Sequence, residues 1–167
     1  EAAESYRQAI KMKPDEAGYY AILAEALYSL ESRDSALSCI RLCLKLDRSN
    51  PTYWEQFTQI VRFLSVSHFD EDLADELNYC MRLAHIKKQQ LEGTIGTLLS
   101  RMPAVEHYRQ LVRTQHEDEL KTAIISGQLF QQLAHSLLLQ FLKKIIITNS
   151  SWESFLAALR RGLLEAC

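Results

Sequence analysis

The chain has 167 residues, enough for one domain with a buried core or for a short array of repeats. Its 47% apolar and 24% charged residues are typical of a globular protein and exclude a disordered chain. The formal net charge of −2 excludes a general electrostatic attraction to nucleic acid or anionic lipid. Five Gly and three Pro are roughly half of the usual share, which predicts an all-α fold with short loops.

Membrane spans and metal sites are not expected. The longest apolar-rich stretch, residues 129–147, is interrupted by Gln, His and Lys residues, and no charged-then-apolar leader opens the chain. The four cysteines have neither the spacing of a zinc site nor the density of a disulfide scaffold. We therefore expect small buried thiols at Cys39 and Cys43, no metal, no cofactor and a cytoplasmic location.

Small and large apolar residues recur 34 residues apart in the first part of the chain. The recurring pairs are Ala2 and Ala36, Tyr6 and Ile40, Ala9 and Cys43, Tyr20 and Trp54, Leu23 and Phe57, and Leu27 and Val61. Small residues on a helix face let a neighbouring helix approach closely, and the large residue between them fills the gap. The repeat therefore predicts stacked helices.

These residues resemble the tetratricopeptide repeat, a unit of two helices. Residues 17–50 match a full unit, residues 1–16 match the second helix of a preceding unit, and residues 51–67 begin a third unit that diverges after Leu64. Arg48 stands where the family has its closing Pro, and Asn50 followed by Pro51 predicts the start of the next helix. The resemblance implies a solenoid of about two and a half repeats.

Residues 68–167 are expected to form a C-terminal helical bundle packed on the repeats as one continuous body. Asp70 is predicted to begin a helix whose buried face holds Phe69, Leu73, Leu77, Cys80, Met81 and Ala84. A weak helix over 91–100, a helix opening at Pro103, and helices over 117–126 and 128–145 follow. A capping box, Ser150-x-x-Glu153, predicts the start of the last helix.

This second half, over residues 68–166, also resembles a helical segment found in multidomain, mostly bacterial proteins between tetratricopeptide repeats and a methyltransferase domain. The resemblance implies an alternative function: an accessory region that positions substrate for an S-adenosylmethionine-dependent enzyme. We expect that catalytic domain beyond Cys167, because 163–167 read as an uncapped helix. The sequence of the full gene distinguishes this alternative from a free-standing scaffold.

No catalytic motif is present in the sequence, so we do not expect an enzyme. Gly93-x-x-Gly96 lacks the third glycine and the preceding strand of a nucleotide-binding loop. Residues 116–119 place an imidazole beside acids, but consecutive helical residues point in different directions and are better explained as a solvated helix start. The other four histidines are scattered, so each is expected to be a surface or satisfied interior histidine.

The tetratricopeptide resemblance implies a concave groove lined by first helices, which would bind a protein or peptide segment. Its candidate residues in this chain are Ala21, Glu25, Tyr28, Glu55, Gln59, Arg62 and Phe63. The Lys and Asn residues with which some family members grip a C-terminal carboxylate are absent, and Glu25 and Glu55 favour a basic or amphipathic segment. Two alternatives stay open: these are solvated polar positions, or the chain's own later helices fill the groove.

The expected function is therefore a non-catalytic interaction scaffold that binds protein and not nucleic acid or membrane. The N-terminal repeat face, with Ala2, Tyr6 and Ala9, has no preceding unit to cover it in this sequence. An uncovered apolar repeat face tends to associate. We accordingly expect self-association through that end.

Overall fold

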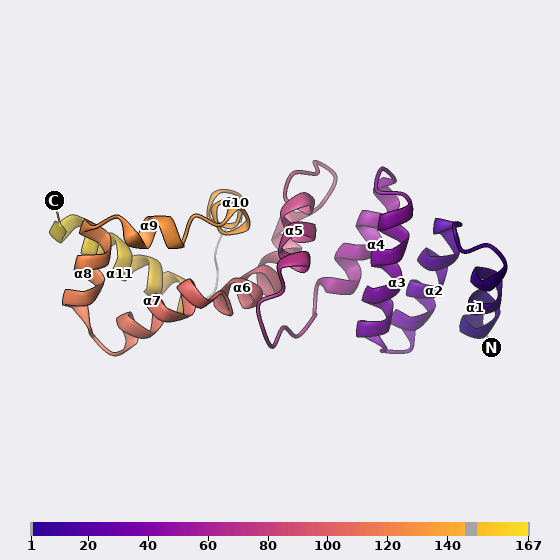
Figure 1. Ribbon diagram of the computed structural model, residues 1–167, viewed down its shortest axis with the longest axis horizontal. Coiled ribbons are helices and arrows are strands. Elements are labelled where there is room, and N and C mark those ends of the chain that lie inside the picture. The colour runs from indigo at the N-terminus through magenta and orange to yellow at the C-terminus, as the bar shows by residue number, and fades with distance from the viewer. Residues whose placement is uncertain (1, 146–149, 167) are drawn as a thin grey trace. The chain divides into compact units, whose positions relative to one another are not determined.

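The computed structural model describes residues 2–145 and 150–166 and contains, within those ranges, eleven α-helices, one 3-10 helix and no β-strand (Figure 1). The expected all-α fold class is confirmed. The chain forms two compact units. The first comprises Glu1–Leu64 and Leu83–Leu91, and the second comprises Ser65–Arg82 and Glu92–Cys167.

The first unit is a row of helices, α1 (Ala2–Met12), α2 (Ala17–Ser29), α3 (Arg33–Leu46) and α4 (Pro51–Val61). Each helix packs against the next, and α2 also contacts α4 (Figure 1). Pro14 lies in the turn before α2, and Glu31 ends α2 with a left-handed φ of 60°. The N–H of Ser32 donates to the carbonyl oxygen of Leu27 at 3.0 Å, which satisfies a carbonyl at the end of α2.

The α2–α3 contact is built from small residues beside large ones. Ala24, Ala36, Ile40 and Cys43 have no exposed side-chain surface, and Leu23 and Leu27 are also buried. Small side chains at the contact let the two backbones approach closely, while Ile40 fills the remaining space. Among the recurring residues, those in the core of this hairpin are Leu23, Leu27, Ala36, Ile40 and Cys43.

The start of α4 follows the predicted capping chemistry. The side-chain oxygen of Asn50 accepts a hydrogen bond from the N–H of Thr52 at 3.0 Å, and Pro51 is the first helical residue. Pro has no N–H to satisfy at that position, so it costs the helix no hydrogen bond. The indole N–H of Trp54 donates to the carbonyl oxygen of Arg48 at 2.8 Å and ties the preceding loop to the helix.

No helix directly following α4 completes a third hairpin in the first unit. Instead, residues 83–91 return to that unit and end in the 3-10 helix η1 (Lys88–Leu91), which contacts α4. Ile86 and Leu91 are buried, and Lys88 Nζ donates to the carbonyl oxygens of Leu83 and Ile86 at 3.0 and 3.5 Å. The sequence pattern did not indicate this return.

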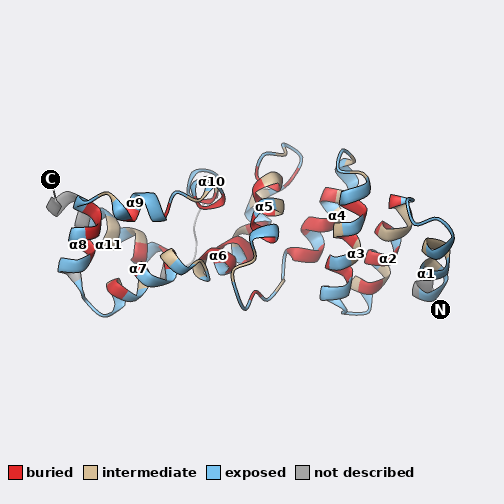
Figure 2. Cartoon of the chain, viewed as in Figure 1, coloured by how far each residue is buried: buried red, intermediate tan, exposed pale blue. Residues whose placement is uncertain are grey.

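The second unit contains the remaining seven helices. They are α5 (Glu71–Cys80), α6 (Glu92–Ser100), α7 (Pro103–Arg113), α8 (Glu117–Ile125), α9 (Gln128–Gln132), α10 (Ser136–Lys144) and α11 (Ser150–Ala166). Here α5, α6 and α10 contact one another, and α11 packs against α7 and α8. Figure 2 shows both buried and exposed residues on these helices, as expected for amphipathic helices around a core.

Several predicted helix boundaries in this unit are confirmed and others are wrong. Asp70 caps α5 as predicted, because its side chain accepts from the N–H of Leu73 at 3.0 Å. Ala84, expected on the buried face of that helix, is exposed and lies beyond its end. The continuous helix expected over 128–145 is two helices, α9 and α10, separated at residues 133–135. The last helix begins at Ser150, and residue 149 before it lies outside the described residues.

Trp152 of α11 is the centre of an aromatic cluster in the second unit. Its indole N–H donates to the carbonyl oxygen of Gly96 at 3.3 Å, and the ring centroids of Phe141 and Phe155 lie 5.4 and 6.0 Å from its own. The guanidinium of Arg109 stacks on the indole at 5.4 Å. Gly96 permits this close approach, because a Cβ at that position would lie 3.2 Å from Trp152 Nε1.

Candidate peptide-binding face

The candidate groove residues lie on α2, on α4 and just after α4, two helices that contact each other. On α4, the buried residues include Trp54, Phe57 and Val61, and Glu55 and Gln59 lie on the opposite, exposed face. On α2, Ala21, Ala24 and Leu27 face inward and Glu25 is exposed. Each helix thus presents at least one carboxylate away from the core, Glu25 on α2 and Glu55 on α4.

Six of the seven predicted residues have accessible side chains. Glu25, Glu55, Gln59, Arg62 and Phe63 are exposed, and Tyr28 is half-buried. The seventh, Ala21, is 3% exposed. The backbone of Ala21 lies within hydrogen-bonding distance of the Cys43 thiol of α3. Ala21 therefore belongs to the α2–α3 packing and cannot offer its side chain to a ligand, which corrects the prediction for this residue.

Ile22 was missed by the sequence reasoning. It lies three residues before Glu25 on the same exposed face of α2, and 41% of its surface is exposed. The resemblance assigns groove positions by spacing and does not include this one. The hydrophobic pattern gave no signal for Ile22, because α2 carries apolar residues around most of its circumference and periodicity does not show which of them stay exposed.

The end of α4 carries an exposed aromatic ring and two cations. Phe63 is 58% exposed, and the Arg62 guanidinium lies 4.9 Å from the centre of its ring, a cation–π arrangement. Arg33, the first residue of α3, donates from Nη1 to the carbonyl oxygen of Phe63 at 3.1 Å. The face is therefore acidic at Glu25 and Glu55 and basic at Arg62, with an apolar ring beside the cation.

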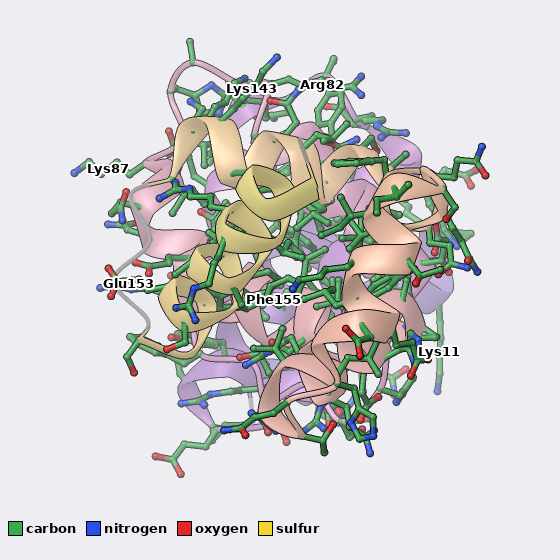
Figure 3. The ribbon with its side chains drawn as sticks, turned by 90° about the vertical axis from the view of Figure 1, so that its left-hand side faces the viewer. Lys11, Arg82, Lys87, Lys143, Glu153 and Phe155 are labelled. Carbon is green, nitrogen blue, oxygen red and sulfur yellow. The ribbon has the colours of Figure 1, made fainter. Side chains whose placement is uncertain are left out.

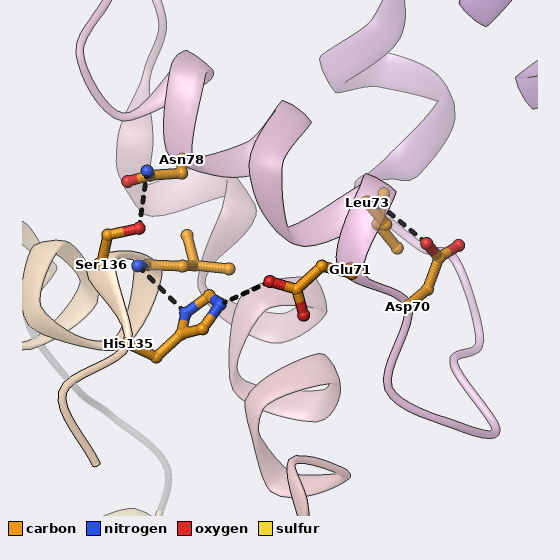
Figure 4. A network of polar contacts seen from close by, with 7 residues as sticks. Asp70, Glu71, Leu73, Asn78, His135 and Ser136 are labelled. Carbon is orange, nitrogen blue, oxygen red and sulfur yellow. Dashed lines mark hydrogen bonds and ion pairs between the residues drawn. The ribbon is translucent and has the colours of Figure 1, made fainter. Parts of the chain in front are cut away.

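A second polar cluster joins α5 to α10 (Figure 4). The imidazole of His135 accepts at Nδ1 from the N–H of Leu137 at 3.2 Å, which caps α10, and its Nε2 lies 3.4 Å from the Glu71 carboxylate. The amide of Asn78 donates to the hydroxyl of Ser136 at 2.9 Å. His135 is thus a structural histidine, as expected.

This second cluster contains a serine, a histidine and an acid but does not have the geometry of a nucleophilic triad. Both ring nitrogens of His135 are engaged, one by a backbone N–H and one by Glu71, so neither can take a proton from Ser136. The Ser136 hydroxyl is held by Asn78. The arrangement fixes two helix ends and activates no nucleophile.

The described cysteines are packing residues. Burial raises the pKa of the Cys43 thiol to about 12, and burial also raises the pKa of the Cys80 thiol to about 12. Burial likewise raises the pKa of the half-buried Cys39. Because the thiolate is the reactive form, these thiols are poor nucleophiles near neutral pH.

Gln115, His116, Asp118 and Glu119, all exposed, line an open depression of about 540 Å³ at the start of α8. This agrees with the expectation of a solvated helix start. Among the residues whose placement is described, no three His, Cys, Asp or Glu side chains are close enough to share a metal ion. No helix in the described ranges is both long and apolar enough to cross a bilayer.

The chain was compared with protein families, with curated proteins and with solved structures. No protein family, no curated protein and no solved structure matches the chain.

Proposed function

We propose that this chain is a non-catalytic interaction scaffold whose first unit is a short array of tetratricopeptide-like hairpins. The exposed face of α2 and α4 binds a protein segment. In support, α2 and α3 pack as a hairpin through the recurring small residues, and α4 packs beside α2 as the first helix of a next unit would. We call Ile22, Glu25, Glu55, Gln59, Arg62 and Phe63 the α2–α4 face.

The observation that carries the proposal is the composition of the α2–α4 face. Phe63 and Ile22 are 58% and 41% exposed, although folding normally buries large apolar side chains. Glu25 is exposed on α2, one turn from Ile22, and Glu55 is exposed on α4. An exposed face that carries two apolar anchors and two carboxylates matches an amphipathic segment that presents both apolar residues and Lys or Arg.

Peptides of defined charge test this function. The probes are synthetic amphipathic peptides that carry Leu and Phe with interspersed Lys and Arg, compared with the same peptides carrying Glu in place of the cations. Fluorescence anisotropy should show binding of the basic set to the full chain, and the affinity should fall as salt screens the exposed charges.

The variant is Glu25→Lys with Glu55→Lys, and the matched control is Asp15→Lys with Asp75→Lys, two exposed acids outside the face. Both double variants change the net charge equally, so a general electrostatic effect would weaken them alike. We expect loss of basic-peptide binding, and of partner recovery in a pull-down, only for the first. Equal binding by the wild type and the Glu25 and Glu55 variant would remove the claim.

A further inference from the structure

The exposed side of α11 carries an ordered set of charged and apolar residues. Trp152 and Phe155 are 2% and 3% exposed and face the core. Glu153, Ala157 and Arg160 are exposed, and Leu156 is half-buried between the two sides. Figure 3 shows Glu153 at the outer edge of the second unit and Phe155 among its interior side chains. We call Glu153, Leu156, Ala157 and Arg160 the α11 face.

The α11 face borders a depression that α10 completes. Leu142 of α10 and Ile145, the residue that follows this helix, line it together with all four residues of the face, and its volume is about 530 Å³. Leu142 is 39% exposed and Leu139, three residues earlier on α10, is 52% exposed. An apolar floor thus lies between a carboxylate and a guanidinium, which are two helical turns, or about 10 Å, apart along α11.

We propose that the α11 face binds the same face of a second copy of this chain, with the two helices antiparallel about a twofold axis. A twofold interface requires a self-complementary surface. In the antiparallel register centred between Leu156 and Ala157, Glu153 lies opposite Arg160 of the partner copy, and Arg160 lies opposite its Glu153. Leu156 lies opposite Ala157 of the partner copy, a large residue against a small one.

The order of the charged residues along α11 favours a second copy of this chain in the antiparallel orientation. A parallel pair in the same register would place carboxylate opposite carboxylate and guanidinium opposite guanidinium, which is repulsive. The exposed Ala157 at the centre permits close approach of the two helices. One helix face is smaller than the roughly 800 Å² that each partner buries in a standard interface, so the dimer should be weak and dependent on concentration.

Sedimentation equilibrium of the full chain over a wide concentration range tests the proposal. Glu153→Arg leaves the face wholly basic and Arg160→Glu leaves it wholly acidic, so each single variant should dimerise about tenfold more weakly, since the twofold axis applies every change twice. The matched control is Arg161→Glu, which makes the same charge change as Arg160→Glu but lies about 100° around the helix. It should dimerise like the wild type.

Two combinations separate this antiparallel pair from any other association. Mixing the two single variants should form a heterodimer in which both charge pairs are restored, and the double variant Glu153→Arg with Arg160→Glu should dimerise as the wild type does. A monomeric wild type at every concentration would overturn the proposal. A dimer whose affinity the two single charge reversals leave unchanged would also overturn it. The same holds for a dimer that Met12→Glu, at the exposed end of α1, abolishes while the charge reversals do not.

Discussion

Gly96 is the position where the packing of the second unit can be tested most sharply. Changing Gly96→Ala would place a Cβ 3.2 Å from Trp152 Nε1 and 3.7 Å from Phe141 Cζ. Both side chains are buried, Phe155 packs edge-on against the indole and the Arg109 guanidinium lies over it, so the ring has little room to retreat. The indole N–H also donates to the carbonyl oxygen of Gly96, so a shift of the ring would disturb this hydrogen bond.

The size of the effect follows from two opposing terms. Ala in place of a helical Gly stabilises by up to ~1 kcal/mol, and overpacking a filled core costs ~1–3 kcal/mol. Gly93, on the same helix, has nothing within 4 Å of its Cβ position and provides the matched control. We therefore expect Gly96→Ala to lower the free energy of unfolding by about 1 kcal/mol and Gly93→Ala to raise it by about 0.5 kcal/mol.

Urea unfolding followed by far-UV circular dichroism measures both changes. In a Trp152→Phe background the nitrogen that meets the new Cβ is gone, so Gly96→Ala should there become neutral or stabilising. The difference between the two backgrounds is the coupling between residues 96 and 152. If Gly96→Ala stabilises the otherwise unchanged chain as much as Gly93→Ala does, the reasoning about this contact is refuted.

Three further predictions concern a helix cap and the buried thiols. Asp70→Ala removes the acceptor of the Leu73 N–H and should cost ~1 kcal/mol of unfolding free energy, whereas Asp70→Asn keeps an acceptor and should cost less; equal losses would argue against the cap. Because the folded-state pKa of Cys80 is about 12 and the unfolded value is 9.0, stability should be intact below pH 9.0 and decline as the pH rises toward 12, a decline that Cys80→Ala should reduce. A thiol reagent should leave Cys43 and Cys80 unmodified in the folded chain near pH 8 and modify them after denaturation, and rapid native labelling of either would contradict their burial.

Local chemistry predicted those features of the fold whose cause lies within a few residues. Asn50 before Pro51 and Asp70 before two acids are start signals that act within one helical turn, and both begin helices in the structure. The exposure of Glu25, Glu55 and Gln59 follows from helix periodicity, because the apolar residues of the same helices fix the opposite side.

The features that the sequence did not predict depend on residues far apart in the chain. The break between α9 and α10 contains no Gly or Pro. There, His135 caps α10 with its own ring and contacts Glu71, 64 residues earlier. Ala21 is buried because α3 covers it, which spacing within α2 cannot reveal. Ile22 was missed because groove positions were carried over from a family, and the pattern of this helix does not show which apolar residues stay exposed.

The return of residues 83–91 to the first unit affects the order in which this protein folds during synthesis. When residues 1–64 have emerged from the ribosome, the surface of α4 that η1 later contacts has no cover. Residues 65–82, which belong to the other unit, must emerge before the covering segment does. The first unit is therefore completed only after part of the second has been synthesised. A nascent chain in which α4 has emerged from the ribosome and residues 83–91 have not would expose apolar surface to chaperones, although the row from α1 to α4 was complete.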